Sequence, residues 1–550
     1  MKAVSEVHSG NRVTSLFAPV LALISTCVFA YGLCGANVGW LSDDYEEVFG
    51  LTAPVPDWRA AFLMGGSGHF SIFRLFKAPI QGYLAFWLGS GFVHVLQFVS
   101  HVLCVLLFYF LLKRIKWSTP ASLAAGMLFC VFPWMSEAVY WWPAATTIWA
   151  TILVLGAAHC LISWNDSHLN RWLVVYAVLV FLSLVLYESW LGGFIFFAVL
   201  DWYYRTAVDG NPKSASRESA RKIRASFWRF GKIAAPFLLY VVLYWIAPSS
   251  DASDRVDLRL PKIPFSIAMV HLRALQWPLD TQWCWTFLNA GTAFHSAPGL
   301  FCLALEIAVL GLLGYAWIRR FPQTDLTPRD ASIWSSLLLG WSIFLGSRIA
   351  LVFQGFIGRY DTRENYAASM GIAVAIVALL SSLIRSKFIG RRLYISVGVA
   401  MLAIVFVLGW TSAGIGVHYV RTARAEAETI LEISEWISAK PDEWSGRTIV
   451  VAADANAISH GTIELAYFNE HDGYWLDYVM KSRCPKCNVF VTNATGCVGN
   501  RRMIALHEAV AQAPVGLAAA ELKNQWWLSS PAVFLRWNGQ DLEREHVACP

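Results

Sequence analysis

The sequence predicts a polytopic α-helical membrane protein, and three observations lead to this prediction. Hydrophobic residues make up 57% of the 550 positions and charged residues only 15%, a composition unlike that of an average soluble domain. Apolar runs long enough to cross a bilayer recur along most of the chain. The loops between these runs alternate between basic and acidic, aromatic compositions, as loops on opposite sides of a membrane do. The net charge of +6 is modest, and no nucleic-acid partner is expected.

About eleven transmembrane helices are expected from the apolar runs. They lie near residues 15–38, 91–112, 119–135, 144–163, 172–187, 189–204, 231–247, 297–318, 332–353, 366–384 and 393–416. The first run is longer than the apolar core of a signal peptide and lacks an obvious cleavage site, so we expect it to be an uncleaved span.

Basic residues cluster in alternate loops and predict the orientation. They are found at 113–116, throughout 205–232, at 319–320 and at 385–392. Because cytoplasmic loops are enriched in Lys and Arg, these loops are expected inside, which places the N-terminus inside and the tail outside. We expect an integral protein of the bacterial inner (plasma) membrane.

Two long outer loops, 45–90 and 251–285, mix aromatic with basic residues. This composition suits amphipathic helices lying on the membrane surface. Interfacial anchoring by aromatic belts is the simpler interpretation for most of these aromatic residues.

The sequence predicts two domains, a transmembrane catalytic domain at 1–416 and an extracytoplasmic α/β domain at 417–550. In the second, 421–440 has helical periodicity, while 448–452 and 489–491 have the composition of buried strands. The tail also holds Cys484, Cys487, Cys497 and Cys549, for which one or two disulfides are favoured over a metal site, with the pairing open. The other seven cysteines lie in the apolar part and are expected to be small core residues.

Four acids follow the first apolar run, in the segment Trp40-Leu-Ser-Asp-Asp-Tyr-Glu-Glu47. An acidic cluster that stops the helix from sliding into the lipid is one interpretation. The other is that Asp43 or Asp44 is a general base at the mouth of a membrane cavity.

Further ionisable residues lie near the outer ends of the expected spans. Glu137 is the single acid of the aromatic turn 132–143, and Glu188 lies where two spans meet with almost no loop. His94, Gln97 and His101 share one helical face, which suits a polar stripe that bonds other helices as well as a functional role. Arg348, Arg359 and Arg363 flank the ninth and tenth spans, together with Tyr366.

Carboxylates and guanidinium groups on one membrane face suit a specific reaction. A carboxylate can remove the proton of an acceptor hydroxyl, while guanidinium groups hold a phosphate and absorb the charge of the leaving group. The sequence has no Gly-rich loop for a nucleotide. The expected donor is therefore a sugar linked to a lipid phosphate.

Several motifs resemble those of the GT-C superfamily of membrane glycosyltransferases, which includes protein O-mannosyltransferases, aminoarabinose transferases and the transmembrane-TPR O-mannosyltransferases. Asp43-Asp44 resembles the acidic pair of the first outer loop. The stretch from His69 to Arg74, followed by His94, Gln97 and His101, resembles the H-x-R-P-L … H-x-x-N-x-x-x-H run of the TPR branch. The turn at 132–141 resembles H-P-x-x-x-E-A-V-x-W, the segment 186–188 resembles S-K-E, and 363–371 resembles E-R-x-x-Y-x-P-S-x-G. The Arg-Pro pair after His69, the Asn at position 97 and TPR repeats are missing.

The resemblance implies roles for these residues. Asp43 would be the general base with Asp44 as the alternate, and Glu137 and Glu188 would orient substrate or catalytic groups. The donor phosphate would be bound by Arg74, Arg348, Arg359 and Arg363. The substrate would contact His69, His94, Gln97, Trp141 and Tyr366.

The implied reaction is inverting transfer from a polyprenyl-phosphate sugar to a glycan, lipid or protein hydroxyl on the outer side. No cofactor is expected, although some superfamily members hold a divalent metal, for which Asp43, Asp44 and His69 would be the ligands. Two alternatives remain open. One is a transporter or flippase of lipid-linked sugars, which would place polar residues near the bilayer midplane. The other is a polymerase or ligase of lipid-linked polysaccharide.

Overall fold

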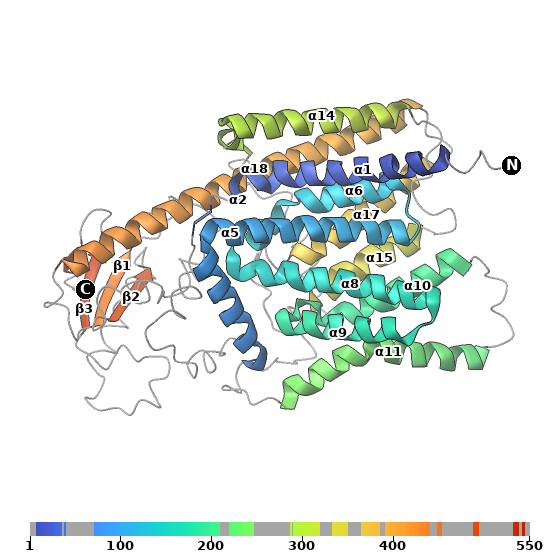
Figure 1. Cartoon of the computed structure of the whole chain (residues 1–550), viewed down its shortest axis with the longest axis horizontal. Coiled ribbons are helices and arrows are strands. Elements are labelled where there is room, and N and C mark those ends of the chain that lie inside the picture. Colours follow the sequence, from blue (N-terminus) through green and yellow to red (C-terminus); the bar gives the residue numbers. More distant parts are fainter. Residues whose placement is uncertain are drawn as a thin grey trace, which may run out of the picture. The chain divides into compact units, whose positions relative to one another are not determined.

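The protein is nearly all helical in its computed structural model, with one small sheet near the C-terminus (Figure 1). The structure describes residues 7–35, 38–39, 71–209, 219–246, 287–288, 290–319, 333–349, 365–385, 391–439, 448–453, 488–493, 532–537 and 542–544. It divides into two compact units. The described residues of the first are 7–35, 71–75 and those from 94 to 417, and the second holds 38–39, 76–93 and those from 418 onward.

Long helices dominate the structure. They are α1 (Val7–Cys27), α5 (Ser71–Arg114), α6 (Thr119–Val131), α8 (Ala145–Ser167), α9 (Asn170–Leu186), α10 (Gly193–Asp209), α11 (Ser219–Ile246), α14 (Ala297–Arg319), α15 (Ile333–Gly346), α17 (Asn365–Arg385) and α18 (Arg391–Ser438). Two of them, α5 and α18, contribute residues to both units. Shorter pieces extend or join them: η1 (Val28–Gly32), α2 (Leu33–Gly35), η3 (Pro133–Met135), α7 (Ser136–Tyr140), η4 (Trp142–Ala144), η5 (Glu188–Gly192) and η10 (Ala290–Phe294).

Each of the eleven expected spans falls on one of these helices. Among the described residues, five helical stretches are long and apolar enough to cross a membrane. They are Trp87–Arg114, Ala145–Ser167, Ala297–Arg319, Asn365–Ile384 and Arg392–Arg421. The chain is therefore a helical membrane protein, while the number of crossings and their direction stay predictions.

Three element boundaries differ from the expected ones. The helix α5 begins twenty residues before the expected span at 91–112, and it is kinked at Gly89, whose φ of 77° only glycine adopts at low cost. The helix α6 stops at Val131 because Phe132 precedes a proline and takes an extended conformation. The helix α18 continues through residue 416, where the sequence predicts the end of the last span, and joins the expected helix at 421–440 without a break.

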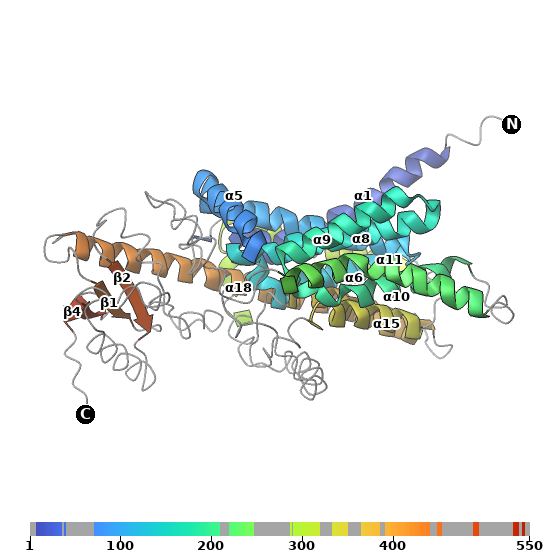
Figure 2. The ribbon, with the colours of Figure 1, turned by 90° about the horizontal axis from the view of Figure 1, so that it is seen from below.

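The helices pack mostly as antiparallel neighbours along the bundle. The helix α9 lies between α8 and α11, and α11 also contacts α10 (Figures 1 and 2). The helices α15 and α17 approach closely at Gly340 and Gly371, since a methyl group at Gly340 would lie 2.7 Å from the carbonyl oxygen of Gly371. Small residues that let two backbones approach are a common means of helix association in membranes.

This close approach makes Gly340→Ala testable against a matched control. We expect the new methyl group to force α15 and α17 apart and to lower the free energy of unfolding by about 1 to 3 kcal/mol. Gly311→Ala on α14 is the control, because a methyl group there meets nothing within 4 Å. It should leave stability unchanged or raise it by up to about 1 kcal/mol through helix propensity. Unfolding in detergent, followed by tryptophan fluorescence, measures both, and equal effects would contradict the packing argument.

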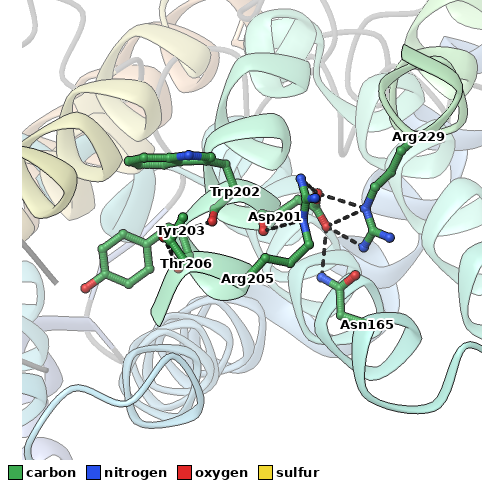
Figure 3. Close-up of polar contacts among 7 residues, drawn as sticks. All are labelled: Asn165, Asp201, Trp202, Tyr203, Arg205, Thr206 and Arg229. Carbon is green, nitrogen blue, oxygen red and sulfur yellow. Dashed lines mark hydrogen bonds and ion pairs between the residues drawn. The ribbon is translucent and has the colours of Figure 1, made fainter. Parts of the chain in front are cut away.

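A buried carboxylate ties three helices together at one end of the bundle (Figure 3). Asp201 of α10 is 2% exposed and accepts two hydrogen bonds from Nε and Nη2 of Arg229 on α11, at 2.9 and 2.7 Å. Asn165 of α8 donates to Asp201 at 2.9 Å, and Arg205 makes a further ion pair at 2.9 Å. Arg229 also lies over the ring of Trp164, at 4.2 Å from its centroid. We call this the basic end of the bundle, because Arg114, the last residue of α5, pairs there with Asp166 of α8, and Lys232 of α11 lies 5.8 Å from the centroid of the Trp164 ring.

The two arginine partners of Asp201 differ in exposure, which predicts different effects of their loss. Arg229→Ala should destabilise the protein by about 3 kcal/mol or more, because it removes the bidentate partner of a buried charge. The side chain of Arg205 is 41% exposed and that of Arg229 only 20%. Arg205→Ala should therefore cost less than about 1 kcal/mol. Thermal unfolding in detergent ranks the two variants, and the reverse order would contradict the assignment.

The small sheet of the second unit has four strands. They are β1 (Thr448–Ala453), β2 (Asn488–Asn493), β3 (Ala532–Trp537) and β4 (Leu542–Arg544), in the order β2-β1-β3-β4. The central strand β1 pairs in parallel with both β2 and β3, and β4 is antiparallel to β3. The two strands predicted at 448–452 and 489–491 are confirmed. The fold of the rest of this region stays a prediction.

Candidate active site

The turn between α6 and α8 carries the first candidate acid, Glu137. Three short elements, η3, α7 and η4, replace the outer end of the expected span at 119–135. Prolines at 133 and 143 begin the two 3-10 turns, where their fixed φ suits a first helical position. Most side chains of the turn are buried, including Tyr140 and Trp142 at 0% exposed. Glu137 itself is only partly buried.

Gln97 of α5 holds this turn in place. Its side-chain amide nitrogen donates to the carbonyl oxygens of Ala138 and Trp141, the latter at 2.8 Å. Gln97, Ala138 and Trp141 are all buried, and the Trp141 carbonyl also accepts from the backbone N–H of Ala144 at 3.1 Å, so the amide adds to the bonding of the turn where water does not reach. The ring nitrogen of Trp149 adds a second link between α8 and α5 by donating to the Ser100 hydroxyl at 3.3 Å.

The second candidate acid, Glu188, begins the short helix η5 between α9 and α10. The indole of Trp190 donates to the hydroxyl of Thr151 on α8 at 3.3 Å, which fixes η5 beside the start of α8. Gly192 ends η5 against the C-terminal end of α15, because a methyl group there would lie 2.9 Å from the carbonyl oxygen of Gly346. Glu188 itself is partly buried. The expectation that it lies where two helices meet with almost no loop is confirmed.

Arg348 lies two residues beyond this glycine contact, just after α15. It is 8% exposed, its guanidinium lies over the ring of Phe344 at 5.5 Å, and one of its Nη atoms donates to the side-chain oxygen of Asn365. Asn365 is the first residue of α17, so this hydrogen bond joins the end of α15 to the start of α17. An arginine in this position is held by the fold before any ligand arrives.

Tyr366, the next residue of α17, connects this helix to α5. Its hydroxyl lies 2.8 Å from Nδ1 of His101, and both side chains are fully buried. The contacts therefore form a closed circuit through α5, the turn at 133–144, α8, η5, α15 and α17. We call this circuit the contact ring. Its members are Gln97, Ala138, Trp141, Trp149, Ser100, Thr151, Trp190, Gly192, Gly346, Arg348, Asn365, Tyr366 and His101.

The contact ring lies at the opposite end of the bundle from Asp201. Gln97 and Arg114 are seventeen residues apart on one regular stretch of α5, which places them about 25 Å apart. Arg114 pairs with Asp166 at 3.1 Å at the basic end. Since a bilayer core is about 30 Å thick, the two groups of charged residues are separated by most of a membrane. Glu137, Glu188 and Arg348 thus belong to one end, and the clustered Lys and Arg residues belong to the other.

The structure places the predicted site residues in three groups. Glu137 and Glu188 lie in segments that the contact ring joins, and Arg348, Gln97, Trp141 and Tyr366 are buried members of the ring. His94 is fully buried on the same helix as Gln97. Asp43, Asp44, His69, Arg359 and Arg363 lie outside the described residues, and only the backbone of Arg74 is described, as part of α5.

The sequence left two interpretations open for Gln97 and His101, a polar stripe that bonds other helices or a functional role. Gln97 and His101 bond to other elements of the bundle, as expected of a polar stripe between helices. The sequence predicts that Tyr366 contacts substrate, and in the structure its hydroxyl is hydrogen bonded to His101 inside the bundle. These residues position the acid-bearing turns, and any contact of theirs with substrate stays a prediction.

Sequence reasoning missed a buried acid in α14. Glu306 is 0% exposed, and its two carboxylate oxygens accept hydrogen bonds from Ser25 at 3.0 Å and Thr26 at 2.9 Å on α1. Most of α14 is otherwise exposed along one edge of the bundle (Figure 1). The signal was available, because Glu306 is the only charged residue between 297 and 318. A lone acid within an apolar span marks an inward-facing position.

An apolar cavity of about 360 Å³ lies between α1, α6, α14, α17 and α18. Its lining includes Pro19, Met127, Leu313, Leu380 and Met401. None of the residues that line it is a member of the contact ring. Its apolar lining suits a hydrocarbon chain rather than a sugar.

Comparisons with known proteins add a distant likeness in structure. No protein-family model matches the chain, and no curated protein sequence matches it. Three solved structures that are similar are all of the oligosaccharyltransferase of Archaeoglobus fulgidus. The one tethered to an acceptor peptide with the NVT sequon is 13% identical with a TM-score of 0.38, covering 86% of this chain and 63% of that chain.

The other two have similar values. The complex with Zn and sulfate is 11% identical with a TM-score of 0.37, covering 86% of this chain and 62% of that chain. The archaeal oligosaccharyltransferase AglB with an inhibitory peptide and a dolichol-phosphate is 11% identical with a TM-score of 0.36, covering 87% and 64%. The chain thus spans less than two thirds of the length of these proteins.

The role of Gln97 in the contact ring is testable by substitution. Gln97→Leu removes both hydrogen bonds from the side chain to the turn, while the Trp141 carbonyl keeps the N–H of Ala144, and the loss should cost on the order of 2 kcal/mol. Hydrogen exchange should quicken at the amides of residues 137–142. Ser381→Ala on α17 is the control, and it should lower stability by less than about 1 kcal/mol because this buried hydroxyl donates to Val377 in its own helix. Unchanged exchange in the turn of Gln97→Leu would contradict the role.

Proposed function

We propose that this protein is an inverting membrane glycosyltransferase of the GT-C type. Its donor is a polyprenyl-phosphate-linked sugar, and its acceptor is a hydroxyl group of a glycan, lipid or protein on the outer side of a bacterial inner membrane. In the reaction, a carboxylate removes the proton of the acceptor hydroxyl, whose oxygen then attacks the anomeric carbon. The bond between that carbon and the phosphate oxygen breaks, and polyprenyl phosphate leaves with the bonding electrons.

The roles follow the residues that carry the family resemblance. Asp43 is the general base, and Asp44 is its alternate. Glu137 and Glu188 orient substrate hydroxyls or the base. Arg348, Arg74, Arg359 and Arg363 bind the donor phosphate, where the planar guanidinium matches two phosphate oxygens at once and offsets the charge that develops on departure.

The contact ring is the observation that carries this proposal. It brings two acid-bearing turns and a held arginine together at the end of the bundle remote from the Lys and Arg clusters. Partly buried acids at a membrane boundary are costly, and a chain that only had to span the bilayer would not need two of them in preorganised turns. Transfer of a sugar away from a lipid phosphate needs such a pairing of base and cation.

A flippase of lipid-linked sugars is the second candidate, and Glu306 is the observation that favours it. A carboxylate near the middle of α14, paired only with hydroxyl groups, resembles the ion- or proton-binding acids of transporters. Such a protein would move its lipid across the bilayer without breaking the bond to phosphate. A polymerase or ligase of lipid-linked polysaccharide would share the transfer chemistry and differ in donor length.

The release of polyprenyl phosphate separates these candidates. The purified protein in nanodiscs is given polyprenyl-phosphate hexoses together with membrane extract of its source as acceptor, and free polyprenyl phosphate is measured. We expect release, and Asp43→Asn and Glu137→Gln should each lower its rate about 100-fold or more while the variants still insert. Glu428→Gln, at an exposed acid of α18, is the control and should keep full activity.

Two outcomes would count against the proposal. Full activity of both Asp43→Asn and Asp44→Asn would show that neither carboxylate is the general base. Movement of the lipid between leaflets of a vesicle, without release of phosphate and with loss in Glu306→Gln, would establish the flippase instead.

A further inference from the structure

Two cysteines and a histidine from three helices meet in the interior of the bundle. Cys27 ends α1, His101 lies on α5, and Cys130 lies near the end of α6. All three are 0% exposed. The two sulfur atoms are 2.9 Å apart, and one atom from each of the three residues lies within 4.8 Å of the others. Among the described residues, this is the one group of three or more such side chains close enough to share a metal ion.

The histidine is oriented as a metal ligand would be. Its Nδ1 atom is engaged by the Tyr366 hydroxyl at 2.8 Å, which fixes the plane of the ring. The ring is further held by edge contacts with Tyr31 and Phe129, at 5.3 and 5.9 Å between centroids. The ring also interacts with the backbone of Cys130, while its buried Nε2 atom has no hydrogen-bond partner of good geometry among the described residues. Metal-binding histidines commonly use one ring nitrogen for the metal and the other for a supporting hydrogen bond.

Charge favours a metal over a mere cluster of thiols. Two thiols attract each other only weakly, so hydrogen bonding between them gives little reason to gather both beside an imidazole. A divalent ion offsets the charge of its thiolate ligands, so that two thiolates and a neutral imidazole around it give zero net charge, and a third thiolate gives −1. Such a site costs less in an apolar interior than the same ions would cost apart.

Cys104 supplies a fourth potential ligand. It lies three residues after His101 on α5, so both side chains emerge from the same face of the helix. It is 0% exposed, and its thiol is hydrogen bonded to Tyr366. Rotation of this side chain away from Tyr366 would complete a set of three cysteines and one histidine. That set is one of the common tetrahedral ligand sets of structural zinc sites.

We propose that Cys27, Cys130 and Nε2 of His101 bind a zinc ion inside the bundle, with Cys104 as the fourth ligand. The ion joins α1, α5 and α6 directly behind the contact ring, of which His101 is a member. Its role is structural: four protein ligands leave no open position for a substrate or a water molecule. This site is separate from the residues proposed for sugar transfer, and it does not depend on that function. It departs from the expectation that these cysteines are only small core residues.

Metal analysis of the purified full-length protein tests the proposal. The protein, carrying an affinity tag without histidines, is produced with added zinc and exchanged into metal-free detergent buffer, and its metals are measured by mass spectrometry. We expect about one zinc per chain in the wild type and below about 0.1 in the double variant Cys27→Ser/Cys130→Ser. Cys160→Ser is the control, because Cys160 is buried on α8 and is not among the three residues of the cluster. It should keep its zinc.

Cobalt substitution provides a readout that does not need the double variant to fold. Wild-type protein produced with Co²⁺ should show thiolate-to-cobalt charge-transfer absorption in the near ultraviolet and the intense visible bands of a tetrahedral site. His101→Cys should keep a metal with a spectrum shifted toward all-sulfur ligation. Three results would overturn the proposal: wild-type protein free of zinc and without this absorption, zinc retained in the folded double variant, or a Cys27–Cys130 disulfide found in the unreduced wild-type protein.

Discussion

Polar groups in the interior of this bundle have only one another as partners. Lipid offers no hydrogen bonds, so each buried donor or acceptor must be satisfied within the protein. Three buried groups among the described residues show how this constraint is met. Asp201 is surrounded by Arg229, Arg205 and Asn165, Glu306 accepts from two hydroxyl groups of α1, and the amide of Gln97 serves two carbonyl groups of the turn at 133–144. These hydrogen bonds and ion pairs join specific helices to one another and hold the turn at 133–144.

The two ends of the bundle use this constraint for different purposes. At the basic end, a buried carboxylate is fully matched by cations, and the result is a clamp on α8, α10 and α11. At the other end, the matched groups are neutral: an amide, an indole, a phenol and an imidazole hold the backbone of the acid-bearing segments. Glu137 and Glu188 are therefore positioned by the fold through their neighbours. Such an arrangement leaves acids on rigid supports, which is the preorganisation that catalysis requires.

The positions of the helices could be predicted from the sequence because apolar runs report burial in lipid directly. The strands at 448–453 and 488–493 were predictable for the same reason, as short apolar runs rich in β-branched residues. Pairings between distant residues could not be predicted. Thr26 and Glu306 are 280 positions apart, and the sequence around either residue does not indicate that the two are partners. The kink at Gly89 and the unbroken course of α18 depend on packing that hydropathy does not record. Of the candidate site, the sequence indicated Glu137, Glu188 and Arg348, but not the circuit of contacts that gathers them.

Photo-crosslinking with a polyprenyl phosphate tests the central claim that the contact ring marks the site where the donor phosphate binds. The probe carries a photoreactive group beside its phosphate and is incorporated with the protein into nanodiscs, and the labelled peptides are identified by mass spectrometry. The account predicts labels on the turn at 133–144, on η5 or on the residues around Arg348, with competition by unlabelled polyprenyl phosphate. Labels confined to the basic end, near Asp201 or on the lining of the apolar cavity, would contradict it.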